Sequence, residues 1–79
     1  MTLRQLEAFR ALMISRTVTK AAEFLSISQP ATTRLISDLE ASVGFPLFVR
    51  RQGRLFPTHE GEEMLKGVER RLVGVQEIA

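Results

Sequence analysis

The segment 20–44 constrains the fold most strongly, because its breaker residues predict two helices joined by a very short turn. The turn at 26–28 contains two serines, whose hydroxyls can bond nearby backbone groups and so compete with helix continuation. Ser28 is expected to cap the second helix, and Pro30 falls in its first turn, where a missing N–H costs nothing. The second helix should end at Gly44, and the proline two residues later prevents a restart. We therefore expect a helix-turn-helix unit, placed at 18–43.

The second helix of this unit has two chemically different faces when it is drawn at 100° per residue. One face forms a core stripe of Thr32, Ile36, Leu39 and Val43, and Leu35 beside it is interpreted as a packing residue. The opposite face carries small hydrogen-bonding groups and one arginine: Gln29, Pro30, Thr33, Arg34 and Ser37. A face meant only for solvent would more often carry Glu and Lys. This composition therefore favours contact with base edges and phosphates of a nucleic acid.

A chain of 79 residues allows one small domain and few kinds of chemistry. It has no cysteine and a single histidine, His59, so neither a disulfide nor a standard zinc site is expected within one chain. The five glycines lie far apart, and no phosphate-binding loop or catalytic triad motif is recognisable. Charged residues within the N-terminal apolar pattern argue against a signal peptide or a membrane span. We therefore expect a protein without enzymatic activity, metal or cofactor.

The positive charge is concentrated in the first 57 residues, although the net charge of the chain is only +2. Residues 1–57 carry eight basic and four acidic side chains, whereas residues 58–79 carry three basic and five acidic ones. Three arginines, Arg50, Arg51 and Arg54, lie within five positions. A local basic cluster of this kind indicates an anionic partner.

Residues 3–15 predict a first helix that covers the helix pair, with Thr2 as its N-cap. Its apolar stripe consists of Leu3, Leu6, Phe9, Leu12 and Met13. The connection that follows is rich in β-branched residues, which are poor in helix interiors. Thr19 is expected to cap the next helix, with Val18 as the apolar residue just before the cap.

Residues 47–57 predict a β-hairpin, because two short apolar runs flank a polar loop that contains Gly53, a residue free to adopt a positive φ. The strands would pack under the helices, and the arginine tip would project as a wing. Arg50, Arg51 and Arg54 would then contact phosphates or a minor groove. The alternative is a solvated loop that keeps an exposed strand from aggregating. Beside a helix-turn-helix, we favour contact.

Residues 59–79 predict a last helix that is capped by Thr58. Its apolar stripe follows a spacing of three and four residues: Leu65, Val68, Leu72, Val75 and Ala79. A stripe that extends beyond a compact domain favours pairing with a second copy of the same helix. The alternative is a helix folded back onto its own core.

The ordered motifs of the chain resemble the N-terminal part of LysR-type transcriptional regulators. They lie at 3–9, 19–25, 28–34, 39–40, 44–50 and 58–61, and so run through essentially the whole sequence. The resemblance implies a mainly α fold, with a bacterial winged helix-turn-helix of three helices plus a β-hairpin wing over 1–58 and a linker helix over 59–79. It also implies an effector-binding domain that is absent from this chain. The part that runs from the start through the recognition helix is also similar to regulators of arginine and opine catabolism.

The same resemblance implies a cytoplasmic regulator that binds double-stranded DNA at an interrupted inverted repeat, as a dimer that becomes a tetramer at full length, with no membrane partner. The recognition-helix contacts would be Ser28, Gln29, Pro30, Thr32, Thr33, Arg34 and Ser37, and the wing contacts Arg50, Arg51 and Arg54. The dimerisation residues would be Leu65, Val68, Leu72 and Val75. Thr32 stands where the family usually has an aliphatic residue, so its hydroxyl needs a partner such as a backbone carbonyl.

Two other classes of function stay open from the residues alone. A winged helix can act as a protein–protein module with its arginine tip facing an acidic partner, although the shortage of acidic groups around 29–37 argues against this. An enzyme fragment would need a cofactor or metal that no motif indicates. Titration with duplex DNA at graded salt concentrations would discriminate between DNA binding and protein binding.

Overall fold

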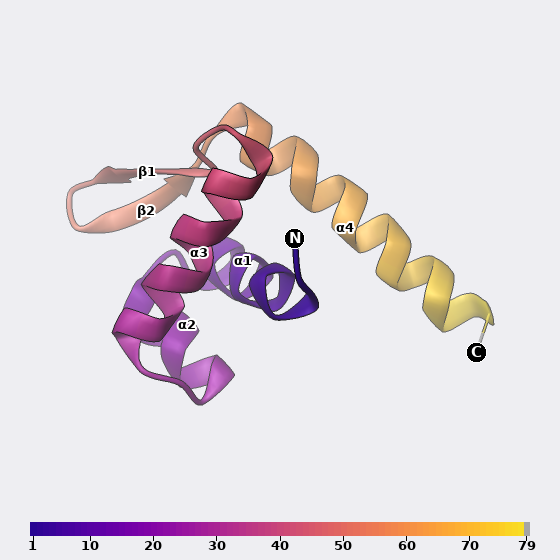
Figure 1. Cartoon of the computed structure of the whole chain (residues 1–79), viewed down its shortest axis with the longest axis horizontal. Coiled ribbons are helices and arrows are strands. Elements are labelled where there is room, and N and C mark those ends of the chain that lie inside the picture. The colour runs from indigo at the N-terminus through magenta and orange to yellow at the C-terminus, as the bar shows by residue number, and fades with distance from the viewer. Residues whose placement is uncertain (79) are drawn as a thin grey trace.

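The computed structural model describes the backbone of residues 1–78 and the side chains of residues 1–68. Four helices and a two-stranded antiparallel sheet make up this part of the chain (Figure 1). Their bounds are α1 (Leu3–Ser15), α2 (Val18–Leu25), α3 (Gln29–Val43), β1 (Phe48–Arg51), β2 (Arg54–Pro57) and α4 (His59–Ile78). The predicted winged helix-turn-helix fold is confirmed.

The core lies between α1, the α2–α3 pair and the base of the hairpin. α1 packs against both α2 and α3. The largest apolar side chains sealed from solvent come from three regions of the chain: Phe9, Leu12, Leu39 and Leu47. The rings of Phe9 and Phe48 have centroids 5.8 Å apart, which joins α1 to β1. The hairpin is therefore part of the folded body at its base.

The prediction that Leu3 belongs to the buried stripe of α1 is wrong, because Leu3 is 69% exposed. Phe9, Leu12 and Met13 are buried. At 100° per residue, Leu3 lies roughly 130° around the helix from the centre of the face that these three share. Its spacing from Leu6 suggested a common stripe, but its direction excludes it from the core.

Side-chain caps define the starts of α1 and α3 as predicted. Thr2 and Gln5 form a capping box, in which each side chain accepts a hydrogen bond from the backbone N–H of the other. The Ser28 hydroxyl oxygen accepts a hydrogen bond from the Ala31 N–H at the start of α3. α3 ends at Gly44, which has a φ of 87°, as expected for a C-terminal glycine.

The start of α2 corrects the prediction that Thr19 is its cap. The N-cap is Thr17, which has an extended backbone and whose hydroxyl oxygen accepts a hydrogen bond from the Lys20 N–H. Val18 is therefore the first residue of α2. The reason lies in Arg16, which ends α1 in the left-handed conformation and turns the chain early.

The wing, residues 47–57, is a hairpin whose two-residue turn is Gln52-Gly53. Both turn residues have positive φ values, 50° and 75°, the combination that a type I′ turn requires. Gly53 was expected there, whereas glutamine at the other position carries a steric cost. The last strand pair before the turn joins Arg51 to Arg54.

A one-residue junction connects the wing to α4. The Thr58 N–H donates to the Leu47 carbonyl, and the Thr58 hydroxyl donates to the Pro46 carbonyl. The same hydroxyl oxygen accepts a hydrogen bond from the Gly61 N–H, so Thr58 caps α4 as predicted. Gly61 is buried, and a Cβ at this position would collide with the Leu47 carbonyl. The first turn of α4 is thus fixed directly against the base of the wing.

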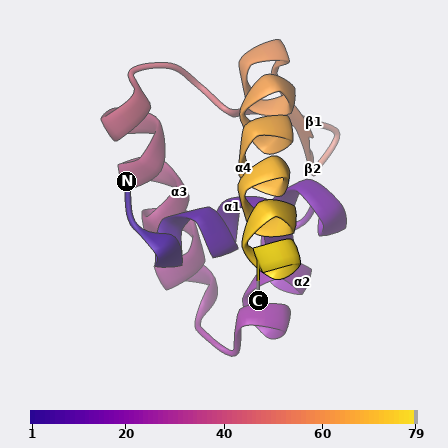
Figure 2. The same cartoon turned by 90° about the vertical axis from the view of Figure 1, so that its right-hand side faces the viewer.

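The first turns of α4 pack on the domain, and the helix then runs away from it (Figures 1 and 2). Met64 and Leu65 are partly buried against the core, and Val68 is half-buried. Leu65, predicted to serve dimerisation, therefore contributes to its own domain, as the alternative of a folded-back helix requires. Leu72 and Val75 lie on the described backbone of α4, but their side chains and all of Ala79 lie outside the described residues.

Candidate nucleic-acid interface

An open groove of about 800 Å³ lies between α3, the start of α2 and the wing. α3 contributes the face that was predicted to contact nucleic acid, called here the readout face: Gln29, Pro30, Thr33, Arg34 and Ser37. The other walls are Thr17, Val18 and Thr19 on one side and Arg50, Gly53 and Leu55 on the other. Among these lining residues two are cationic and none is acidic. The structure thus brings the predicted readout face and part of the wing together around one surface.

α3 presents this face because its opposite face is buried. Ile36 and Leu39 are 7% and 0% exposed, and Leu35 is partly buried against the core, as its predicted packing role requires. By contrast, the Arg34 side chain is 85% exposed. Arg34 is two positions from both Thr32 and Ile36, and a two-residue step turns a helix by about 200°, so its side chain points away from the core. The packing of the core therefore fixes which side chains face the groove.

Two of the predicted recognition-helix contacts do not line the groove. Thr32 is fully buried, and its hydroxyl donates to the Ser28 carbonyl at 3.0 Å. The prediction that Thr32 contacts DNA is therefore wrong, whereas the predicted hydrogen bond from its hydroxyl to a backbone carbonyl is confirmed. Ser28 is exposed, but its hydroxyl oxygen is occupied by the cap of α3.

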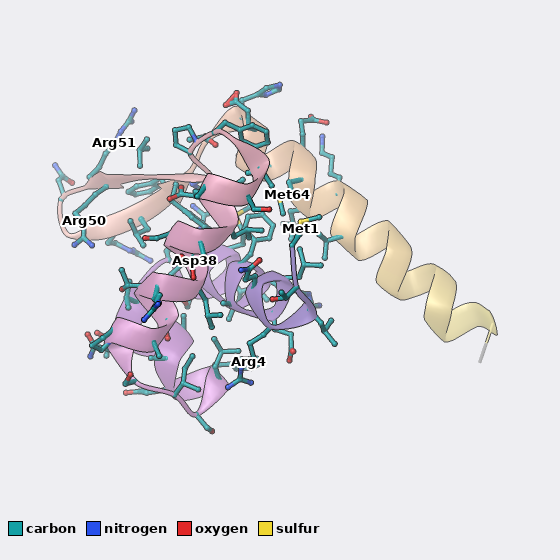
Figure 3. All side chains as sticks on the ribbon, viewed as in Figure 1. Met1, Arg4, Asp38, Arg50, Arg51 and Met64 are labelled. Atoms are coloured by element: carbon teal, nitrogen blue, oxygen red, sulfur yellow. The ribbon has the colours of Figure 1, made fainter. Side chains whose placement is uncertain are left out.

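Asp38 lies on α3 (Figure 3), four residues after Arg34 and beside the readout face. Its carboxylate Oδ2 is 4.0 Å from the Arg34 Nε, and both side chains are exposed. An exposed pair at this distance contributes little to stability. The sequence prediction did not identify this acidic neighbour of Arg34.

The three wing arginines divide between the two faces of the hairpin. Arg50 pairs across the strands with Leu55, and both line the groove. Arg51 pairs with Arg54, and cross-strand partners project from the same face, so these two lie on the other side. Figure 3 shows Arg50 and Arg51 on opposite sides of the hairpin. The predicted cluster is thus one groove arginine and one arginine pair.

The start of α2 is a groove wall that the sequence prediction missed. Thr17, Val18 and Thr19 line the groove at the N-terminal end of α2. The N–H groups of a first helical turn have no partner within the helix, and they favour a negatively charged ligand. A correct placement of the Thr17 cap would have indicated this end of the helix.

Two residues outside the groove hold the wing, and neither was predicted to have a role. The Glu40 Oε2 accepts hydrogen bonds from the Leu47 N–H at 2.6 Å and the Phe48 N–H at 3.3 Å, where β1 begins. The Arg16 carbonyl accepts a hydrogen bond from the Leu55 N–H of β2 at 2.9 Å. The position of the wing, which forms one wall of the groove, therefore depends on Arg16, just before α2, and on Glu40, near the end of α3.

Within the part of the chain that the structure describes, no group of three or more His, Cys, Asp or Glu residues could hold a metal ion. None of the described helices combines the length and apolarity needed to cross a membrane.

Comparison with known proteins connects this geometry to a family. The family model described as "Bacterial regulatory helix-turn-helix protein, lysR family" matches residues 3–62. The regulatory protein NocR of Agrobacterium fabrum is 49% identical over 75 residues, which cover 95% of this chain and 25% of NocR. The octopine catabolism/uptake operon regulatory protein OccR of Rhizobium meliloti is 44% identical over 78 residues, which cover 99% of this chain and 26% of OccR. The chain spans about a quarter of the length of these curated relatives.

Solved structures agree in fold and sequence. The complex of the CbnR DNA-binding domain with DNA matches with a TM-score of 0.89 and 32% identity, over 98% of this chain and 88% of that chain. The complex of the BenM DNA-binding domain with catB site 1 DNA matches with a TM-score of 0.89 and 33% identity, over 99% of this chain and 84% of that chain. With its matched motifs, its winged fold and a groove between helix and wing, this chain belongs to the lysR family of bacterial regulatory helix-turn-helix proteins.

Proposed function

We propose that this chain is the DNA-binding part of a transcription regulator and that it recognises double-stranded DNA by sequence. The observation that carries the proposal is the groove, whose α3 wall offers hydroxyls, an amide and one arginine and whose lining includes no acidic side chain. The major groove of B-DNA is wide enough to admit an α-helix. Two similar domains have been solved in complex with DNA, which supports DNA binding by this chain.

In this mode α3 enters the major groove and its outer residues read base edges. Arg34 is suited to donate two parallel hydrogen bonds to a guanine, and the Thr33 methyl group can pack on a thymine methyl. Ser37 and Gln29 supply further donors and acceptors. The start of α2 meets a phosphate through its free N–H groups.

The wing supplies the electrostatic part of the proposed binding. Arg50 faces the same groove as α3 and is placed to contact the adjacent backbone. Arg51 and Arg54 stand directly opposite each other, and like charges in that position destabilise a hairpin. A phosphate or a narrow minor groove would offset this repulsion, which supports a contact with DNA at the wing tip.

We further propose a homodimer through α4, with two recognition helices at half-sites about 34 Å apart, or a multiple of this, on an interrupted inverted repeat. The support is the apolar stripe of α4 and the direction of the helix, which leaves the domain (Figure 1). Val68, Leu72 and Val75 carry the contact, and Leu65 divides its surface between the partner helix and its own core. A tetramer in the bacterial cytoplasm and a separate effector-binding domain complete the proposal for the whole protein. The likeness to OccR favours catabolism or uptake genes as the target class.

Selection of bound duplexes from a random pool, followed by fluorescence-anisotropy titration in graded salt, tests the readout. Arg34→Ala should weaken binding to the selected duplex by about 1–3 kcal/mol and reduce its preference over a shuffled duplex. Thr33→Ala should have a smaller effect in the same direction. Arg4→Ala removes an exposed arginine of α1 that does not line the groove, so it is the matched control and should bind like the wild type.

Arg34→Ala and Thr33→Ala variants that bind both duplexes like the wild type would show that α3 does not read the sequence. Absence of binding to any duplex would favour the protein–protein alternative.

Sedimentation velocity tests the dimer separately. Leu72→Glu places a charge in the predicted stripe and should convert a dimer into a monomer at micromolar concentration, because burying an unpaired carboxylate is costly. Glu69→Gln, a polar substitution next to the stripe, is the control and should leave the mass unchanged. A dimer that persists in Leu72→Glu would exclude this helix as the interface.

A further inference from the structure

Arg16, at the corner between α1 and α2, contacts β2 through both its backbone carbonyl and its side chain. The Arg16 carbonyl accepts a hydrogen bond from the Leu55 N–H at 2.9 Å, and the Arg16 guanidinium carbon lies 6.0 Å from the centroid of the Phe56 ring. The Arg16 Nε also donates to the Met13 carbonyl at 2.8 Å, which holds the side chain in place. A single residue thus contacts the wing through both its backbone and its cation.

Arginine is an unfavourable residue for this corner as far as the backbone is concerned. Arg16 has a φ of 64°, a left-handed conformation in which glycine has no steric cost and residues with a Cβ do. A glycine would end α1 equally well. The arginine side chain therefore needs another explanation, and its visible contacts are the α1 carbonyl and the wing aromatic ring.

The part of the wing between its base and its arginine tip needs further contacts to hold it in place. Its base is fixed by the buried Leu47 and Phe48 and by the Glu40 carboxylate. Farther along, Leu55 is partly buried against the core, but Val49 and Phe56 are each 38% exposed, and an isolated two-stranded hairpin is only marginally stable. The Arg16 contacts lie on the second strand, between the base and the arginine tip.

We infer that Arg16 is a positioning residue that fixes the angle of the wing against the helix-turn-helix. By holding β2, it sets the separation of Arg50 from Arg34 across the groove and, with it, the position of the Arg51–Arg54 pair at the wing tip. Arg16 itself does not line the groove, so it acts through the wing and not by touching DNA. The inference rests on the proposed function only where it predicts an effect on DNA binding.

The first test is independent of DNA. Arg16→Gly removes the side chain and suits the backbone, so the thermal midpoint should stay close to that of the wild type. The ¹⁵N relaxation of the Gly53 and Arg54 amides should nevertheless show a more mobile wing, and Phe56→Leu should have the same effect. Arg16→Lys keeps a cation over the ring and should restore part of the order. Arg4→Ala should change nothing.

The second test uses DNA affinity. Arg16→Gly should weaken binding roughly two- to fivefold, the factor that corresponds to a partly exposed cation–π contact. In a variant that already lacks the arginine pair, Arg51→Ala with Arg54→Ala, the further loss on adding Arg16→Gly should be smaller. Such non-additivity is expected when one residue acts through another.

The two tests separate the inference from the proposed function. Unchanged relaxation at Gly53 in Arg16→Gly would overturn the positioning role, whatever happens to DNA affinity. Full DNA affinity in the variant without the arginine pair would overturn the proposed tip contact, while the relaxation data would still decide the role of Arg16. A full, additive affinity loss in the triple variant would contradict action through the wing tip.

Discussion

α3 and the wing both face the groove, but the fold holds them in different ways. α3 is fixed along its length, because Thr32, Ile36 and Leu39 bury its inner face in the core. The wing is buried mainly at its base, and beyond the base it is held by the partly buried Leu55 and by a few specific bonds. The difference teaches that α3 derives its geometry from packing along its whole length, whereas the wing combines packing at its base and at Leu55 with hydrogen bonds and one cation–π contact.

The same difference suits the two kinds of contact that we propose. Hydrogen bonds to base edges demand fixed directions, which a packed helix provides. Contacts to phosphates tolerate small displacements, because charge attraction falls slowly with distance. A less rigid wall is therefore sufficient for the wing arginines. Substitutions in α3 and in the wing can test whether the two walls differ in how they are held.

The largest expected effect comes from the packing of α3. Leu39→Ala should lower the free energy of unfolding by about 2–5 kcal/mol, because Leu39 is fully buried and its removal leaves a cavity. Val49→Ala, a truncation of a partly exposed wing residue, should cost under about 1 kcal/mol. Urea denaturation followed by circular dichroism measures both. Equal losses would mean that the two walls are held alike.

Glu40 is the next test, because it joins α3 to the wing. Glu40→Ala leaves the partly buried Leu47 and Phe48 N–H groups without their acceptor and should destabilise the fold by about 1–3 kcal/mol. Amide exchange should accelerate at the wing base more than in α1. Glu23→Ala, a substitution of an exposed carboxylate on α2, is the control. An effect no larger than that of the control would show that the wing base does not depend on this carboxylate.

The wing arginines should change salt dependence and leave sequence preference nearly intact. Replacing Arg51 and Arg54 with alanine should reduce the log–log slope of affinity against salt by roughly 0.9 for each lost phosphate contact. The ratio of selected to shuffled duplex affinities should stay close to that of the wild type. A changed ratio with an unchanged slope would mean that the wing reads bases and would reverse the proposed division of roles.

The smallest effect concerns the turn of the wing. Gln52→Asn should raise the free energy of unfolding by roughly 0.5 kcal/mol, because asparagine tolerates the positive φ of this position better than glutamine. Thermal unfolding monitored by calorimetry measures the change. A lower midpoint would indicate that the Gln52 side chain has an interaction that asparagine cannot replace.

Features that depend on neighbouring residues could be predicted from the sequence. The Ser28 and Thr58 caps, the Gly44 helix end and the positive φ of Gly53 each follow from local backbone chemistry. The outer face of α3 followed from helical periodicity, because the buried face was clearly apolar apart from Thr32.

Features that depend on distant contacts could not be predicted. The Thr17 cap follows from the left-handed Arg16, and nothing in the local sequence favours that conformation for arginine. The roles of Arg16 and Glu40 require knowing which strand lies beside each of them. The division of the wing arginines between two faces requires the strand register, which the turn residues set only once the position of Gln52 is known.

The junction at Thr58 has a mechanical consequence. Only this residue separates β2 from α4, and it is hydrogen-bonded to the loop before β1 and to the first turn of the helix. Gly61 leaves no clearance there for a side chain. The first turn of α4 and the base of the hairpin are therefore joined without a flexible linker, so a change in the direction of α4 is expected to shift the base of the wing with it.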